Sequence, residues 1–257
     1  MSSIHFLHAV RQFELEVAME EFPKSPGSVL RVLELGAGTG EQARLLEQKG
    51  YAVTAIDMPD SAYSHQRIFP MHDYDGVKIP FPQDSFDIVF SSNVLEHVVK
   101  IDVILDEISR VLVPSGYAIH ILPTASCRFF GILSHYMWVL RRTFAFFGRS
   151  SKAEMPPPVV PKTRHDLLIT IFPFRHGERG NTITEMFYFS EWYWKKMFKK
   201  HGFIISKIRP THLFYTMAGG LEQHLTIKQR QILSAVLGSA CSIYVLKNND
   251  NITKQDI

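Results

Sequence analysis

The sequence predicts an α/β protein with a doubly wound, mostly parallel seven-stranded sheet, helices on both faces and an inserted cap segment. Three observations support this prediction. From residue 28 to 124, short apolar runs of strand length alternate with helical patterns, which is the order of βαβ units. The strand runs are almost continuously apolar, as in strands that are covered on both faces. The first of them leads directly into a glycine turn and a helix.

The elements can be predicted in order from apolar spacing and from breaker residues. Helical spacing predicts an N-terminal helix over residues 5–22. Ser190 is a suitable N-cap for a helix over 190–201. The remaining strands are expected at 29–35, 51–56, 88–90, 117–122, 202–208 and 242–247, and the remaining helices at 41–49, 101–112 and 221–238.

We expect the whole chain, 1–257, to form a single domain. Residues 28–124 would form the ligand-binding core, and residues 190–257 would complete the sheet. Between them, the segment 125–189 is aromatic, proline-broken and irregular in pattern. We interpret this segment as an insertion that caps the ligand side of the sheet.

The composition is that of a globular protein with a large core, since 46% of its 257 residues are hydrophobic and 21% are charged. The net charge of +3 is spread along the chain, so no nucleic-acid partner is expected. Cys127 and Cys241 lie far apart and do not suggest a disulfide framework. The N-terminus lacks the apolar region of a signal peptide, and no run of 18 apolar residues occurs. A cytoplasmic location is therefore expected.

The glycine turn, residues 36–40 with the sequence GAGTG, differs from the turns that bind phosphate groups. A dinucleotide fingerprint has the spacing G-x-G-x-x-G, whereas the third glycine here comes one residue early. Glu41 stands where that fingerprint needs glycine, and its carboxylate would repel a pyrophosphate. A Walker A sequence is absent. These departures weaken the prediction of a phosphate-bearing ligand.

Two acids suggest another kind of ligand. Glu34 precedes the glycines at the end of the first strand, beside backbone N–H groups that could meet an amino acid group. Asp57 ends the second strand, where a carboxylate can bind a ribose diol. Together they indicate a nucleoside with a zwitterionic tail, a description that fits S-adenosylmethionine.

Four motifs in order resemble class I S-adenosylmethionine-dependent methyltransferases with a Rossmann-like fold, nearest to the small-molecule type known as type 11. They are VLELGAGTG, AID, YDGVKIPFPQDSFDIVFSSNVLEHV and ILDEISRVLVPSGYAIHILPT. The resemblance covers about residues 28–124. The one departure, VPSGY in place of the usual KPGG, changes a turn only. The resemblance implies S-adenosylmethionine as cofactor and S-adenosylhomocysteine as product.

The resemblance also assigns cofactor contacts by position. Glu34, Gly36, Ala37 and Gly38 would face the methionine moiety. Asp57 would bind the ribose hydroxyls.

The resemblance also places residues at the adenine ring and at the reaction centre. Met58 would lie against adenine. Asp75 would contact adenine beside the backbone of Gly76, with Asp73 as a rival for that role. Asn93 would lie near the sulfonium centre.

Histidines are the natural candidates for a general base at the methyl acceptor, because their usual pKa lies near neutral pH. His97 follows the fourth strand, and His176 lies in the polar loop RHGERGN of the cap segment. Both are candidate catalytic residues, although either could instead be a structural part of the pocket wall. Neither an H-x-x-x-H motif nor a carboxylate cluster occurs, so no metal is expected.

The cap segment is more weakly similar to bacterial methyltransferases that modify sugars of surface polysaccharides. This similarity suggests a small-molecule acceptor such as a nucleotide-linked or lipid-linked sugar, methylated on oxygen or nitrogen. Arg141, Arg142, Arg175 and Arg179 could bind a phosphate of such an acceptor or could be solvated charges. The aromatic stretch 129–147 could touch a membrane surface, but burial or a homodimer contact is the stronger expectation.

Two other functions remain open from the sequence. A nicotinamide-dependent oxidoreductase would share the fold, but the glycine spacing and Glu41 disfavour it. A non-catalytic binding or scaffold protein could retain the pocket without transferring a methyl group. The intact cofactor motifs disfavour that alternative.

Overall fold

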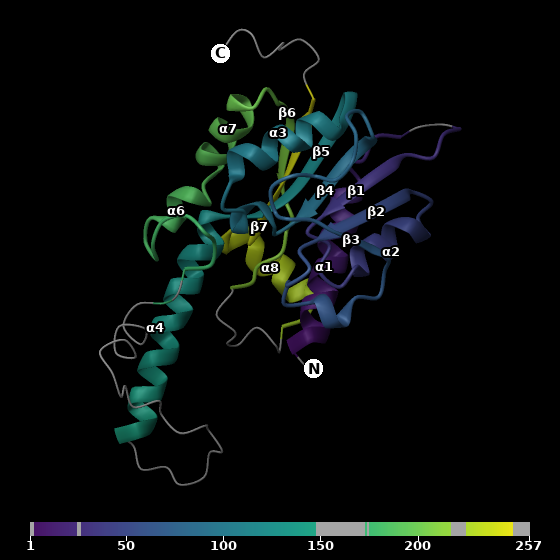
Figure 1. The fold of residues 1–257 in the computed structure, drawn as a ribbon. Coiled ribbons are helices and arrows are strands. Elements are labelled where there is room, and N and C mark those ends of the chain that lie inside the picture. Colours follow the sequence, from purple (N-terminus) through teal and green to yellow (C-terminus); the bar gives the residue numbers. More distant parts are fainter. Residues whose placement is uncertain (1–2, 25–26, 148–172, 174, 217–224, 249–257) are drawn as a thin grey trace.

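The computed structural model describes residues 3–24, 27–147, 173, 175–216 and 225–248. Seven strands form one sheet in the order β3-β2-β1-β4-β5-β7-β6 (Figure 1). Their bounds are β1 Arg31–Leu35, β2 Ala52–Asp57, β3 Met71–Asp73, β4 Phe86–Ser92, β5 Leu112–Pro123, β6 Ile204–Pro210 and β7 Cys241–Lys247. Only β7 runs antiparallel to its neighbours, β5 and β6. The predicted fold class is therefore confirmed.

The strand order reverses between β1 and β4. From β1 the chain continues to β2 and β3 on one side, whereas β4 and β5 lie on the other side. In open α/β sheets, ligands bind outside the carboxyl ends of the strands at this switch point.

Helices cover both faces of the sheet. Their bounds are α1 Ser3–Met19, α2 Glu41–Gln48, α3 Ile101–Val111, α4 Ala125–Phe147, α6 Glu185–Tyr188, α7 Glu191–Lys200 and α8 Ile227–Leu237. One core cluster packs α3 and α7 against the sheet, through residues such as Ile104 and Phe198. A second cluster packs α1 and α2 against the other face, through residues such as Leu15 and Leu46.

Sequence periodicity explains most of these elements. The buried side chains of α3 recur at helical spacing from Ile101 to Val111. Helix α7 begins after Ser190, whose side-chain oxygen accepts a hydrogen bond from the backbone N–H of Tyr193, as predicted for an N-cap. Helix α8 begins at Ile227 after a capping box formed by Thr226 and Gln229.

Three elements differ from the prediction. Strand β3 was missed because its three residues are partly exposed and carry no apolar run. Strand β5 begins at Leu112, and its register with β4 shifts between Phe86 and Ile88 to accommodate the turn residues 113–116. The first third of the segment 125–189 is not irregular, because Ala125–Phe147 form the single helix α4.

Helix α4 projects away from the sheet in Figure 1 instead of lying across the strand ends. Within the described part of the chain, no helix combines the length and apolar character needed to cross a membrane. The division into a core, a cap and a C-terminal part stays a prediction.

Candidate active site

A cavity of about 860 Å³ lies at the carboxyl ends of the strands, at the switch point between β1 and β4. Its wall is formed by the loops that follow β1, β2, β3 and β4, by helices α1 and α2, and by His176 and the segment around Tyr215. This volume lies in the upper part of the range of about 300–1,000 Å³ that is usual for small-molecule sites. It leaves room for a cofactor and a second small molecule.

The glycine turn forms the floor of the cavity at the end of β1. The N–H groups of Gly36 and Ala37 donate to the carbonyl oxygen of Ile56 at 2.8 and 3.1 Å, which ties the turn to β2. Gly36 has φ +70°, and a Cβ atom there would lie 2.6 Å from a methyl group of Val94. A side chain at position 36 would therefore be strained and would crowd the loop after β4.

Asp57 is held at the end of β2 with its carboxylate in the cavity wall. Its two oxygens accept hydrogen bonds from the backbone N–H groups of Gly38 at 3.0 Å and Met58 at 2.8 Å. A carboxylate offers about four lone pairs, so acceptor capacity remains for a ligand. Its fixed position suits the diol of a ribose.

The residues predicted for adenine gather on the next two loops. Met58 is 42% exposed, and a Cβ atom at Gly76 would lie 3.5 Å from its sulfur, so these two residues face each other. Asp75 lines the cavity and accepts hydrogen bonds from the backbone N–H groups of Val77 and Lys78.

The rival acid Asp73 lies elsewhere. It is paired with Arg67 at 2.7 Å, and it is absent from the described residues that line the cavity. The structure thus brings Asp75 to the predicted site in preference to Asp73.

Glu34 does not reach the cavity, in contrast to the prediction that it faces the methionine moiety. Its side chain is buried, with a relative exposure of 2%. The carboxyl group interacts with the backbone N–H of Ala43, and its Oε2 atom has no hydrogen-bond partner in the described part of the chain. Burial raises the pKa of Glu34 to about 8, and the nearby Asp57 adds to the shift. Glu34 therefore contacts the first turn of helix α2 and not the cavity.

Asn93 occupies the loop after β4, as predicted, and lines the cavity. Its φ of +54° is a left-handed conformation that asparagine tolerates better than most residues. Its backbone N–H donates to the carbonyl oxygen of Ile121 at 2.8 Å, and its side-chain oxygen accepts a hydrogen bond from the thiol of Cys241 at 3.4 Å. These contacts fix Asn93 in the cavity wall.

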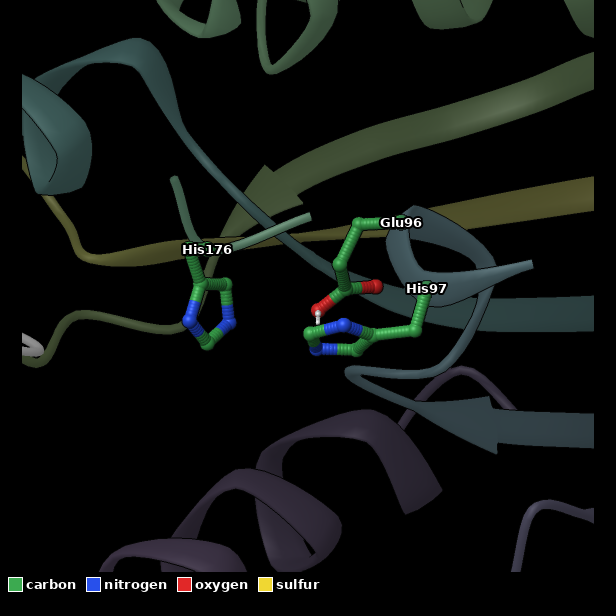
Figure 2. A group of neighbouring side chains, drawn as sticks. All are labelled: Glu96, His97 and His176. Atoms are coloured by element: carbon green, nitrogen blue, oxygen red, sulfur yellow. Dashed lines mark ion pairs between the residues drawn. The ribbon is translucent and has the colours of Figure 1, made fainter. Parts of the chain in front are cut away.

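The two candidate catalytic histidines meet at one side of the cavity. The ring centroids of His97 and His176 lie 4.7 Å apart with an interplanar angle of 69°. Figure 2 shows the carboxyl group of Glu96 beside the ring of His97, with the ring of His176 facing both. Nothing in the sequence pattern indicated this grouping, because the residues come from distant segments.

Burial affects the protonation of both rings. It lowers the pKa of His97 below its usual value, and it lowers the pKa of His176 to about 3, with the neighbouring His97 contributing. Both imidazoles are therefore neutral at pH 7, and each can accept a hydrogen bond. His176 is a poor proton acceptor in comparison with His97.

The loop that carries His176 is held by a buried ion pair. Glu185, at the start of α6, accepts hydrogen bonds from the backbone N–H groups of His176 at 2.7 Å and of Gly177. Arg128 on α4 approaches the same carboxylate at 2.7 Å, and both side chains are buried. Helix α4 thereby positions His176. Of the described residues of the segment 125–189, only His176 lines the cavity.

Helix α1 contributes a part of the wall that the sequence analysis missed, formed by His8, Arg11 and Gln12. Arg11 pairs with Glu14 at 2.6 Å and donates to the hydroxyl of Tyr215 at 3.3 Å. Arginine beside acids on an amphipathic helix is the usual pattern of a solvated face, so no local signal marked Arg11.

The residues present fit S-adenosylmethionine. Gly36 and Gly38 bring their backbone to the cavity without a side chain, Asp57 is placed for a diol, and Met58 with Gly76 forms an apolar wall. The carboxylates of Asp57 and Glu41 in or near the turn favour a cationic ligand over a phosphate chain.

Comparisons with known proteins agree with this fit. Residues 33–120 match the family described as a methyltransferase domain. The ubiquinone biosynthesis O-methyltransferase of Paramagnetospirillum magneticum is 29% identical over 115 residues, which cover 41% of this chain and 45% of that protein. The chain spans less than half the length of the curated relatives it first matches, with 18%, 45% and 36% of their lengths covered.

Solved structures share the fold over nearly the whole chain. An S-adenosylmethionine-dependent methyltransferase from Mesorhizobium loti has a TM-score of 0.56 at 16% identity, covering 91% of this chain and 97% of that one. The cyclase SpnF has a TM-score of 0.51 at 17% identity, covering 94% and 82%. These likenesses show the fold alone, and one fold can host several activities. The family match over residues 33–120 and this shared fold together imply S-adenosylmethionine as the cofactor.

Proposed function

We propose that this protein transfers a methyl group from S-adenosylmethionine to an oxygen or nitrogen atom of a small molecule. One observation carries the proposal. A single cavity extends from the glycine turn and Asp57 to His97 and His176. A cofactor bound at the turn and an acceptor bound at the histidines would share that space.

The chain's own residues would mainly position the two reactants. When bound, S-adenosylmethionine supplies an electrophilic methyl group whose leaving group is already activated. Alignment of the nucleophile therefore provides most of the rate enhancement. Asp57 would hold the ribose, and Met58 and Asp75 would hold adenine.

At the acceptor side, the neutral ring of His97 would accept a hydrogen bond from the acceptor's O–H or N–H group. His176 would orient the same group from the cap. The pair would thereby point the acceptor's lone pair at the methyl carbon.

Oxygen is the acceptor atom that we favour, because a matched relative is named as an O-methyltransferase. A sugar or glycan precursor remains our finer proposal for the acceptor. Arg175 and Arg179, which could bind a phosphate of such an acceptor, have other contacts within the protein. Arg175 interacts with Glu178 at 3.2 Å, and Arg179 donates to the carbonyl oxygens of Leu95 and Val98. The side chains at 141 and 142 lie outside the described residues.

A homodimer remains part of the proposal. Helix α4 exposes five large hydrophobic side chains on its described part, namely Phe129, Leu133, Tyr136, Met137 and Leu140. Their spacing forms one stripe along the helix, which could pack against a second copy. Nucleic acid is not a proposed partner.

The alternative function is a protein with this fold that binds the cofactor without methylating anything. The cyclase SpnF favours keeping this alternative, because its name gives an activity other than methyl transfer although it shares the fold. A nicotinamide-dependent oxidoreductase is the weaker alternative, since Glu41 lines the cavity at the helix start where a pyrophosphate would lie.

The test combines binding with product formation. The full chain is titrated calorimetrically with S-adenosylmethionine and, separately, with NAD. It is then incubated with S-adenosylmethionine and a panel of phenols, hydroxylated quinones and nucleotide sugars. We expect tighter binding of S-adenosylmethionine and release of S-adenosylhomocysteine above the level without acceptor. Tighter binding of NAD would contradict the cofactor, and binding without release for any acceptor would favour the non-catalytic alternative.

A further inference from the structure

Three side chains with metal-binding atoms gather where the acceptor would lie. One atom from each of Glu96, His97 and His176 lies within 4.8 Å of the others, and the Nε2 atom of His97 lies 3.9 Å from Oε1 of Glu96 (Figure 2). In a tetrahedral zinc site with bonds of about 2.0–2.1 Å, ligand atoms lie roughly 3.3 Å apart. The cluster therefore needs only a small contraction, which the half-exposed ring of His97 can supply by rotation.

The two segments that carry the cluster are bound firmly to each other. The backbone N–H of Glu178 donates to the carbonyl oxygen of Glu96 at 2.9 Å. Arg179 donates to the carbonyl oxygens of Leu95 at 3.0 Å and Val98 at 2.8 Å. These contacts hold the His176 loop against the segment 95–98. The ligand atoms thus lie together before any ion binds, as a preorganised site requires.

The carboxyl group of Glu96 provides an independent indication of a ligand. Its relative exposure is 1%, and apart from an interaction with its own backbone N–H neither of its oxygens has a hydrogen-bond partner in the described part of the chain. A buried carboxyl group without a partner is costly, and such groups are normally paired or bound to a metal. Burial accordingly raises the pKa of Glu96 to about 8. A cation at the cluster would satisfy this group.

Nearby cations do not already satisfy Glu96. Arg11 is paired with Glu14, and Arg179 directs its terminal nitrogens at backbone oxygens. Both arginines lower the pKa of Glu96, but by less than burial raises it. Glu178 adds a negative charge near His97. The surroundings therefore contain carboxylates as well as guanidinium groups.

We propose that Glu96, His97 and His176 bind one divalent transition-metal ion of the zinc class, with an open position toward the cavity. Two imidazoles and one carboxylate with a free fourth position are the donor set of catalytic zinc sites. This inference rests on the proposed function and places the ion between the histidines and the acceptor. It also replaces the sequence-based expectation that the protein holds no metal.

The ion would activate an acceptor hydroxyl. Binding to a divalent metal lowers the pKa of a hydroxyl group, so its proton is released to solvent near neutral pH. The oxygen lone pair then forms a bond to the methyl carbon while the carbon–sulfur bond breaks and its electrons pass to sulfur. The products are the methyl ether, S-adenosylhomocysteine and one proton. This route does not need His176 as a base, for which its pKa is unsuited.

The experiment measures metal binding directly. The full chain is treated with a chelator and titrated with Zn²⁺ by competition with an indicator, and with Co²⁺ by visible absorption. We expect one ion per chain and an absorption pattern of nitrogen and oxygen ligands. E96Q and H176A should each weaken Zn²⁺ binding by about 100-fold or more, because each removes one of three ligands. Both variants are chosen to keep the chain folded: E96Q keeps the side-chain volume, and H176A removes a ring that is partly exposed.

Two matched controls mark the site. E178Q removes an exposed carboxylate of the same loop, and H65A removes an exposed histidine. Both should bind Zn²⁺ as the natural chain does. Weak binding by the natural chain, or unchanged binding by E96Q and H176A, would overturn the metal site. S-adenosylmethionine affinity, measured in the same samples, separates the two proposals: if it persists while Zn²⁺ binding fails, only this inference is lost.

Discussion

The two sides of the cavity are built in different ways. The proposed cofactor side consists of loops that directly follow strands β1 to β4, so each residue is placed by its own strand and turn. The proposed acceptor side combines His97, shortly after β4, with His176 and helix α1, which come from distant parts of the chain. The position of His176 depends on side-chain contacts, above all the buried pair of Arg128 and Glu185.

This difference suggests that the two sides can be altered separately. A change in a turn should affect cofactor binding and leave the acceptor side in place. A change in the supporting contacts of the His176 loop should affect turnover and leave cofactor binding in place.

Replacing Glu185 with alanine should damage the acceptor side most. The variant leaves the buried guanidinium of Arg128 without this carboxylate and removes two hydrogen bonds to the His176 loop. Breaking a buried ion pair costs about 3–5 kcal/mol of unfolding free energy. We expect methyl transfer to be lost while S-adenosylmethionine affinity, measured by calorimetry below the unfolding temperature, is retained.

The control for this change is the exposed ion pair of the same loop. R175A removes the partner of Glu178, and an exposed pair contributes at most about 1 kcal/mol. If E185A and R175A affected turnover equally, the buried pair would not position His176. If E185A fails to fold, E185Q takes its place in the turnover measurement, because glutamine keeps the shape of the side chain.

Replacing Gly36 with alanine should damage the cofactor side most. The left-handed φ of +70° costs an L-residue roughly 1–2 kcal/mol, and the new Cβ atom would press on Val94. Overpacking of this kind adds about 1–3 kcal/mol. We expect lower stability in urea unfolding and weaker cofactor binding.

Gly50 offers a matched control because it also has positive φ, +91°, but no atom lies near its Cβ position. G50A should lose stability without losing cofactor affinity. Adding V94A to G36A should restore part of the affinity by removing the clash. Equal loss of cofactor affinity in G36A and G50A would contradict the role assigned to the turn.

Replacing Asp57 with alanine should weaken cofactor binding by about 1.5–3 kcal/mol, the range for hydrogen bonds to a charged group. Asp73 is the matched control, because it lies opposite Asp57 on the adjacent strand β3 yet is absent from the described wall of the cavity. D73A should leave the dissociation constant unchanged. An unchanged constant in D57A would refute the ribose assignment.

Replacing Glu34 with glutamine should change how stability depends on pH. Burial raises the pKa of Glu34 from 4.5 to about 8 in the folded state, so the folded chain binds a proton that the unfolded chain has released. Its contribution to stability is therefore complete below about pH 4.5 and is lost as the pH rises toward 8. The advantage of E34Q should grow with pH in that window, by at most about 1.4 kcal/mol per unit.

Urea unfolding of both proteins at pH 5.5, 6.5 and 7.5 checks this expectation. Glu96 titrates in the same direction, but it is present in both proteins and cancels in the difference. A difference that stays constant with pH would mean that Glu34 is ionised in the folded chain.

The two sides also differ in how far the sequence predicted them. The strand runs, the glycine turn and Asp57 are local features, and the structure places them as expected. Glu34 was misplaced because the sequence shows that an acid ends a strand but not which way its side chain is packed. Strand β3 was missed since three partly exposed residues carry no apolar period.

The acceptor side was predicted only as separate residues. His97 and His176 were both named, but their approach to Glu96 depends on the hydrogen bonds of Arg179 and Glu185, for which the sequence has no periodic signal. Helix α1 was predicted as a helix, yet its place beside the cavity follows from the packing of Leu15 and Val10 in the core.

A crystal structure of the full chain with S-adenosylhomocysteine tests the central claim most directly. We expect the ribose hydroxyls on Asp57, adenine against the wall formed by Met58 and Gly76, and the sulfur facing the side of the cavity that holds His97 and His176. A ligand bound elsewhere, or a turn closed by side chains when the ligand is present at saturating concentration, would contradict it.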